Sequence, residues 1–81
     1  MNAKINRIIV ARDTRDSNVA HINYEGKEDG SDTHGKLGTL YFFNPDGVVL
    51  CGISGRPSCI FHNTRDVYSH LQKYGVRVDR A

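Results

Sequence analysis

The feature that most constrains this chain is a pair of apolar segments joined by a turn, residues 37–54. LGTLYFF is followed by NPDG and then by VVLCGIS. Pro45 fixes φ at the second turn position, and Gly47 can adopt the left-handed conformation of a bulge that closes a hairpin. The pattern predicts two antiparallel strands. Both strands carry apolar residues on both faces, so we expect one face to meet the core and the other to meet a partner or ligand.

A second hairpin is predicted upstream. Residues 5–12, INRIIVAR, are rich in β-branched side chains, and residues 19–25, VAHINYE, alternate between apolar and polar. Period-two alternation is typical of a half-buried strand. The hexapeptide DTRDSN between them has the length and the Asp and Ser content of a hairpin loop.

Residues 26–36, GKEDGSDTHGK, contain no aliphatic or aromatic side chain and include three glycines. This composition predicts a mobile acidic loop. Glu28, Asp29 and Asp32 do not follow the alternating spacing of a calcium-binding loop, so we expect no cation site there.

The C-terminal part predicts one helix over residues 62–75, HNTRDVYSHLQKYG. Asn63 is a good N-cap with Asp66 three residues later, and Gly75 follows the last turn. The helical spacing predicts a buried stripe of Val67, Leu71 and Tyr74. With CIF (59–61) as a short extended segment and VRVD as a last strand, the expected fold is α+β. It comprises a mostly antiparallel sheet of four to five strands, in the order β-β-β-β-α-β, with the helix packed on one face.

A chain of 81 residues is expected to form a single domain, with no room for a cleft between two lobes. We expect no cofactor and no catalytic residues, and therefore not an enzyme. The sequence has no apolar run of the ~20 residues that span a bilayer, and its first residues lack a secretory signal. These features, with only two cysteines, favour a cytoplasmic protein with reduced thiols and no membrane partner.

Two cysteines and two histidines fall within one short stretch of the chain. The candidate metal set is Cys51, Cys59, His62 and His70. Seven residues separate the two cysteines and seven separate the two histidines, in place of the short spacings that let one turn present two zinc ligands. A zinc-stabilised domain is therefore an alternative that requires all four side chains to converge. A reactive thiol at Cys59, or a disulfide between the cysteines, is a weaker alternative.

The net charge is only +2, with the basic residues concentrated toward both ends. If the ends meet in the fold, their arginines could form one basic face. Tyr41 and Phe43 could then stack unpaired bases beside it, which makes a nucleic-acid-binding module a second alternative. The candidate anion or nucleic-acid residues are Arg7, Arg12, Arg56, Arg65 and Arg77.

The favoured interpretation is a non-enzymatic protein-binding module. A domain with one helix cannot cover both faces of two-faced apolar strands, so a protein partner or a second copy is expected to cover the rest. The candidate partner-binding residues are Tyr41, Phe43, Val49 and Ile53. An analogy of size and style suggests an inhibitor or adaptor of a larger machine, of the kind that phages and mobile elements encode.

Overall fold

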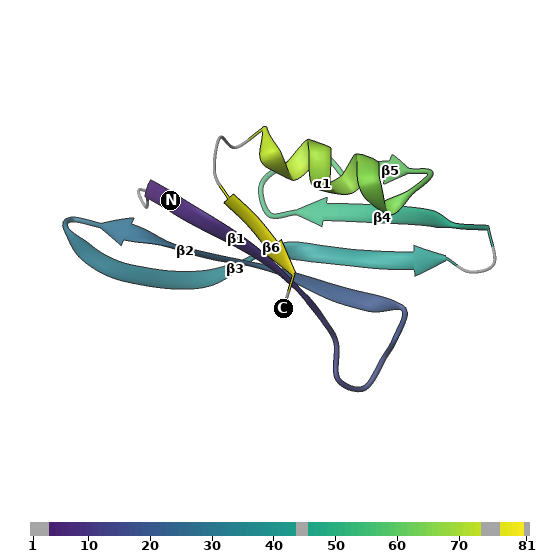
Figure 1. The fold of residues 1–81 in the computed structure, drawn as a ribbon, viewed down its shortest axis with the longest axis horizontal. Coiled ribbons are helices and arrows are strands. Elements are labelled where there is room, and N and C mark those ends of the chain that lie inside the picture. The colour runs from purple at the N-terminus through teal and green to yellow at the C-terminus, as the bar shows by residue number, and fades with distance from the viewer. Residues whose placement is uncertain (1–3, 44–45, 74–76, 81) are drawn as a thin grey trace.

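The computed structural model describes residues 4–43, 46–73 and 77–80, and within these residues it contains six strands and one helix. The strands form a single sheet in the order β5-β4-β3-β2-β1-β6 (Figure 1). The elements are β1 (Lys4–Arg12), β2 (Val19–Glu28), β3 (Ser31–Phe43), β4 (Val48–Ile53), β5 (Cys59–Phe61), α1 (Thr64–Gln72) and β6 (Arg77–Arg80).

The predicted α+β class and the single C-terminal helix are confirmed, whereas the predicted sheet of four to five strands was too small. The segment CIF forms the edge strand β5, antiparallel to β4. The chain then passes through α1 to the opposite edge, where β6 lies parallel to β1. Because a helical connection can return the chain in the same direction, the last strand makes the sheet mixed.

The predicted loop over residues 26–36 is wrong, because these residues form the distal part of the β2–β3 hairpin. Glu28 pairs with Ser31, which leaves a two-residue turn of Asp29 and Gly30. Their φ angles are 51° and 80°, and two positive values are what a type I′ hairpin turn requires. This part of the hairpin extends beyond α1 (Figure 1), so its side chains can be polar without weakening the core.

The turn between β3 and β4 has the predicted glycine geometry. Gly47 has a φ of 75°, and its N–H donates a 3.1 Å hydrogen bond to the carbonyl of Phe43. Pro45, to which the sequence assigns the second turn position, lies outside the described residues.

The N-terminus of α1 is capped as predicted. The Asp66 N–H donates a 2.8 Å bond to Asn63 Oδ1, and Asn63 Nδ2 donates a 3.1 Å bond to Asp66 Oδ2. Val67 and Leu71 are fully buried, which confirms two members of the predicted stripe. Tyr74 and Gly75 lie outside the described residues.

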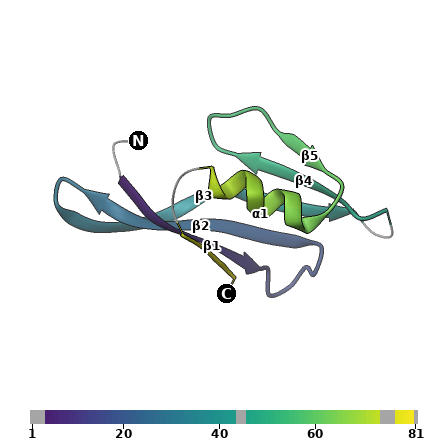
Figure 2. The ribbon, with the colours of Figure 1, turned by 45° about the horizontal axis from the view of Figure 1, so that its top comes forward.

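The sheet has two unlike faces. Figures 1 and 2 show α1 on one side only, and we call that side the covered face and the other side the open face. Among the described elements, none lies over the open face. The buried residues of the sheet and the helix form one cluster: Ile8, Val10, Ala20, Ile22, Tyr24, Leu37, Leu40, Val49, Cys51, Ile53, Val67 and Leu71.

Candidate functional site

An apolar strip crosses the open face over four strands. Register places Val19 opposite Tyr41, Tyr41 opposite Leu50, and Leu50 opposite Ile60. Directly opposed residues point to the same face, so these four side chains form one row. Phe43 and Val48 form a second, shorter row beside it. The open-face strip is therefore Val19, Tyr41, Phe43, Val48, Leu50 and Ile60.

Three side chains of the open-face strip are well exposed. The exposed fractions are 44% for Tyr41, 52% for Phe43 and 63% for Ile60. These are the large hydrophobic residues that stand exposed among the described residues. A contiguous group of this kind is typical of an interaction surface, whereas single exposed apolar residues are ordinary.

The four predicted partner-binding residues do not share one surface. Tyr41 and Phe43 lie on the open face, but Val49 and Ile53 are 2% and 8% exposed and belong to the core. In the β3–β4 register the residues opposite Tyr41 and Phe43 are Leu50 and Val48, so the alternate positions of β4 turn inward.

Sequence patterning does not identify the other members of the strip. The apolar runs of β3 and β4 are continuous, so alternation cannot tell which residues share a face until the register is known. Ile60 lies on a three-residue strand, which is too short to show a period. The signal that identifies Val48 and Leu50 is the length of the turn, because it fixes the register of the hairpin.

A histidine and an aspartate lie beside the strip at the β1–β2 end of the open face. Asp13 Oδ1 is 2.8 Å from His21 Nε2. The second carboxylate oxygen accepts hydrogen bonds from the backbone N–H groups of Arg15 and Asp16. The His21 contact, followed by these two backbone bonds, lowers the pKa of Asp13 to about 2. The carboxylate is therefore charged at neutral pH and holds the turn.

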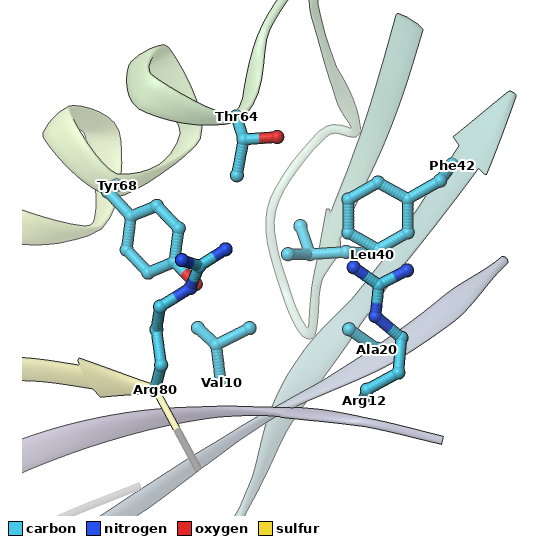
Figure 3. A pocket seen from close by; sticks show the side chains of 8 residues that line it. All are labelled: Val10, Arg12, Ala20, Leu40, Phe42, Thr64, Tyr68 and Arg80. Atoms are coloured by element: carbon cyan, nitrogen blue, oxygen red, sulfur yellow. The ribbon is translucent and has the colours of Figure 1, made fainter. Parts of the chain in front are cut away.

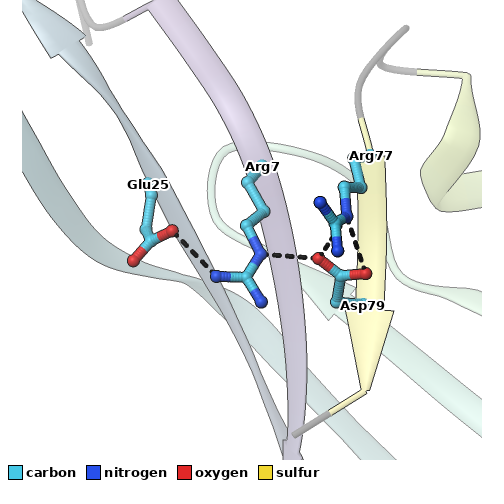
Figure 4. Close-up of polar contacts among 4 residues, drawn as sticks. All are labelled: Arg7, Glu25, Arg77 and Asp79. Atoms are coloured by element: carbon cyan, nitrogen blue, oxygen red, sulfur yellow. Dashed lines mark hydrogen bonds and ion pairs between the residues drawn. The ribbon is translucent and has the colours of Figure 1, made fainter.

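The two ends of the described chain lie side by side, as the basic-face hypothesis requires, but carboxylates lie beside their arginines and form ion pairs with them. Arg7 on β1 lies opposite Arg77 on β6 in the register. Arg7 is 3.1 Å from Glu25 and 2.6 Å from Asp79, and Arg77 is 2.8 Å from Asp79 (Figure 4). Hydrogen bonds from Arg7, then from Arg77, lower the pKa of Asp79, and the Asp79 bond raises the pKa of Arg7. This part of the open face therefore carries balanced charge.

The remaining predicted arginines lie elsewhere. Arg12 lines a cavity on the covered face with Arg80, which is not among the five arginines predicted from the sequence. Arg65 lies on α1 beside an adjoining hollow, and Arg56 follows β4. The five predicted arginines thus do not form one patch.

Three of the four predicted metal-binding residues lie around one small cavity. Cys51 and Cys59 are directly opposed across β4 and β5, and with His70 they line a space of about 230 Å³. His62 is not among its lining residues. Both thiols are free, and the described residues contain no group of three or more His, Cys, Asp or Glu arranged to hold a metal ion.

The contacts of His70 and Cys51 are those of residues that pack in the structure. The His70 ring packs on Phe61, with ring centroids 5.2 Å apart. Burial raises the pKa of the Cys51 thiol, and the neighbouring Cys59 adds to the shift. A raised pKa makes Cys51 a poor thiolate nucleophile at neutral pH.

No protein-family model, curated protein or solved structure matches this chain. Across the described residues, the single helix is too short and too polar to cross a bilayer.

Proposed function

We propose that this protein is a small protein-binding module, that the open-face strip is its binding surface, and that a second copy of the chain occupies that surface. The observation that carries the proposal is the continuous apolar row on the open face, with Tyr41, Phe43 and Ile60 exposed. An inhibitor or adaptor role, suggested by size alone, is not part of this proposal, because a second copy would occupy the strip.

The energetics favour covering the strip. Burying a large apolar side chain contributes about 1.5–3 kcal/mol relative to leaving it in water. Aromatic residues are enriched in interface cores, where a few of them supply most of the binding free energy. Tyr41 and Phe43 lie two positions apart on β3 and so present both rings to the same side.

The chemistry of the open face suits a second copy. No member of the strip is charged, so a two-fold contact of the strip with itself brings no like charges together. The charged residues of the open face outside the strip include the Arg7, Glu25, Arg77 and Asp79 network, which contains equal numbers of each sign, and Asp13, which is paired with His21. Two sheets pack face to face at about 10 Å, which would place each strip in a two-layer core.

The size of the molecule also permits a contact between two copies of the chain. A standard interface buries about 800 Å² per partner. The molecule extends 44 × 26 × 21 Å along its principal axes, so its longer faces have room for such a contact.

The nucleic-acid alternative has less support on this face. Base stacking on Tyr41 and Phe43 would need cations along the same face to track phosphates. The two arginines placed there, Arg7 and Arg77, are paired with carboxylates.

Sedimentation equilibrium over a range of concentrations tests the proposal. The unmodified chain is expected to be a dimer that dissociates on dilution. Tyr41→Ser and Phe43→Ser are each expected to weaken dimerisation by about tenfold or more, because central aromatic residues dominate interfaces. Lys36→Ser, at an exposed residue of β3 outside the strip, is the control and is expected to leave the dissociation constant unchanged.

A chain that stays monomeric at every concentration would overturn the assignment of a second copy. Equal dissociation constants for Tyr41→Ser, Phe43→Ser and Lys36→Ser would show that another surface mediates association. If the unmodified chain retains a single-stranded oligonucleotide at low salt and Tyr41→Ser does not, the nucleic-acid alternative replaces the proposal.

A further inference from the structure

A cavity of about 230 Å³ lies on the covered face, between the sheet and the start of α1. Its lining is apolar on the sheet side and basic at both ends (Figure 3). The residues that line it are Val10, Arg12, Ala20, Leu40, Phe42, Thr64, Tyr68 and Arg80.

Each of the two arginines is held against an aromatic ring. The Arg12 guanidinium carbon lies 4.5 Å from the centroid of Phe42, and Arg12 also donates to the carbonyl of Ser17. The Arg80 guanidinium carbon lies 5.5 Å from the centroid of Tyr68, and its Nε donates a 3.1 Å bond to the Tyr68 hydroxyl. Ring stacking fixes the plane of a guanidinium and leaves its charge in place.

Neither arginine takes part in the carboxylate ion pairs of the described residues. The carboxylates closest in sequence to Arg12 and Arg80 form their ion pairs on the open face. Asp13 pairs with His21, and Asp79 pairs with Arg7 and Arg77. Strand alternation separates Arg80 from Asp79. Asp13 follows the end of β1 and turns toward His21. Within the described residues, the cavity is thus flanked by two positive charges with which no carboxylate forms an ion pair.

The helix adds a side chain that can donate a hydrogen bond. Thr64, the first residue of α1, lies at the top of the cavity in Figure 3 and carries a hydroxyl. The partial positive charge of this helix end is offset by the Asp66 carboxylate in the first turn. Two guanidinium groups and a hydroxyl around one small space match a compact oxyanion with two negative charges.

We propose that the cleft between Arg12 and Arg80 binds the phosphate group of a small phosphate monoester. A phosphate monoester carries close to two negative charges at neutral pH, whereas a carboxylate or a phosphodiester carries one. The cavity of about 230 Å³ has room for one phosphate group. It is too small for a drug-sized ligand, for which pockets usually exceed about 300 Å³.

The rest of the ligand has an adjoining space. A second hollow of about 390 Å³ shares Thr64, Tyr68 and Arg80 with the cavity and continues past Arg65 and Val78. Its lining combines apolar surface with one further cation. The phosphate site lies on the covered face and the strip on the open face, so either assignment can fail without the other.

Titration of the isotopically labelled protein with inorganic phosphate and with phenyl phosphate, followed by amide NMR shifts, tests this site. Both ligands are expected to shift the Thr64 and Arg80 amides, and phenyl phosphate is expected to bind more tightly. Arg12→Gln and Arg80→Gln are each expected to weaken phenyl phosphate binding by about tenfold or more, because each removes a charged hydrogen-bond donor. Arg15→Gln, at an exposed arginine outside the cavity, makes the same change of charge and is expected to alter affinity by less than about twofold.

Dispersed amide spectra of the unliganded variants establish that they are folded, and Arg12→Lys, which keeps the charge, is expected to retain part of the affinity. Equal weakening by Arg15→Gln and Arg12→Gln would overturn the site, since it would indicate nonspecific screening. Binding of benzoate as tightly as phenyl phosphate would overturn the phosphate assignment. Binding of a single-stranded oligonucleotide at Arg12 and Arg80, without binding of phenyl phosphate, would also overturn the phosphate monoester assignment.

Discussion

Arg7 Nε donates a 2.6 Å hydrogen bond to Asp79 Oδ2 and so ties β1 to β6 across 72 positions of sequence. The same carboxylate pairs with Arg77, which stands opposite Arg7 in the register. We expect Asp79→Ala to lower the melting temperature, because it leaves two guanidinium groups facing each other on adjacent strands. The loss is expected to be smaller at high salt, which screens exposed charges.

Asp32→Ala is the matched control for that change. The Asp32 side chain is 92% exposed and lies 3.9 Å from Lys27, a distance at which a surface pair contributes little. Differential scanning calorimetry at low and high salt measures both variants. A melting temperature lowered equally by both substitutions would contradict the role given to Asp79.

Acid is expected to destabilise the protein through two carboxylates. The pKa of Asp13 falls from 3.8 to about 2 in the folded chain, and the pKa of Asp79 is also lowered. At acid pH the unfolded chain therefore binds more protons than the folded chain at these sites. Their stabilisation is complete above the unfolded pKa of 3.8 and is lost as the pH falls toward 2.

Urea unfolding at a series of pH values measures this loss. The free energy of unfolding is expected to decline below about pH 4, and Asp13→Asn is expected to decline less than the unmodified chain. An identical acid profile for Asp13→Asn would show that the His21 contact does not stabilise the fold.

Gly38 is expected to tolerate no side chain. A Cβ built there would lie 2.0 Å from the carbonyl oxygen of Gly52 on β4, and this backbone atom cannot move without distorting the sheet. Gly38→Ala is expected to lower the free energy of unfolding by about 1–3 kcal/mol or more, as overpacking does. Gly52→Ala is the control, because its nearest contacts are at an ordinary 3.9 Å. Equal unfolding midpoints in urea would contradict the close approach of β3 and β4.

The two thiols are expected to react with an alkylating reagent at different rates. Cys51 is 2% exposed and its thiol pKa is raised, whereas Cys59 is half-buried on the edge strand. Alkylation requires an accessible thiolate, so Cys59 should be labelled first and Cys51 only when the sheet opens. Peptide mapping of the native protein after timed labelling measures the order, and earlier labelling of Cys51 would contradict the packing described for β4 and β5.

The parts of the fold that sequence predicts are those set by local chemistry. Gly47 at its turn and Asn63 at its helix each act within a few residues, and both are where the sequence places them. The distal part of the β2–β3 hairpin, residues 26–36, is not predicted because it has no apolar alternation, although the Asp29-Gly30 pair is itself a strong turn signal.

The functional surfaces are less accessible to sequence because they depend on pairings between distant strands. Register alone places Ile60 in line with Val19 through two intervening strands. Likewise, Arg80 joins Arg12 at one cavity only because β6 adds beside β1. No pattern within one segment carries either relationship.

The most direct test of the protein-binding assignment is an isotope-filtered NOE experiment on a mixture of labelled and unlabelled chains. It records only contacts between different molecules. The account predicts intermolecular NOEs among the side chains of Tyr41, Phe43, Leu50 and Ile60. Under conditions where sedimentation finds a dimer, intermolecular NOEs confined to α1 or to the distal β2–β3 hairpin, with none from the open-face strip, would contradict it.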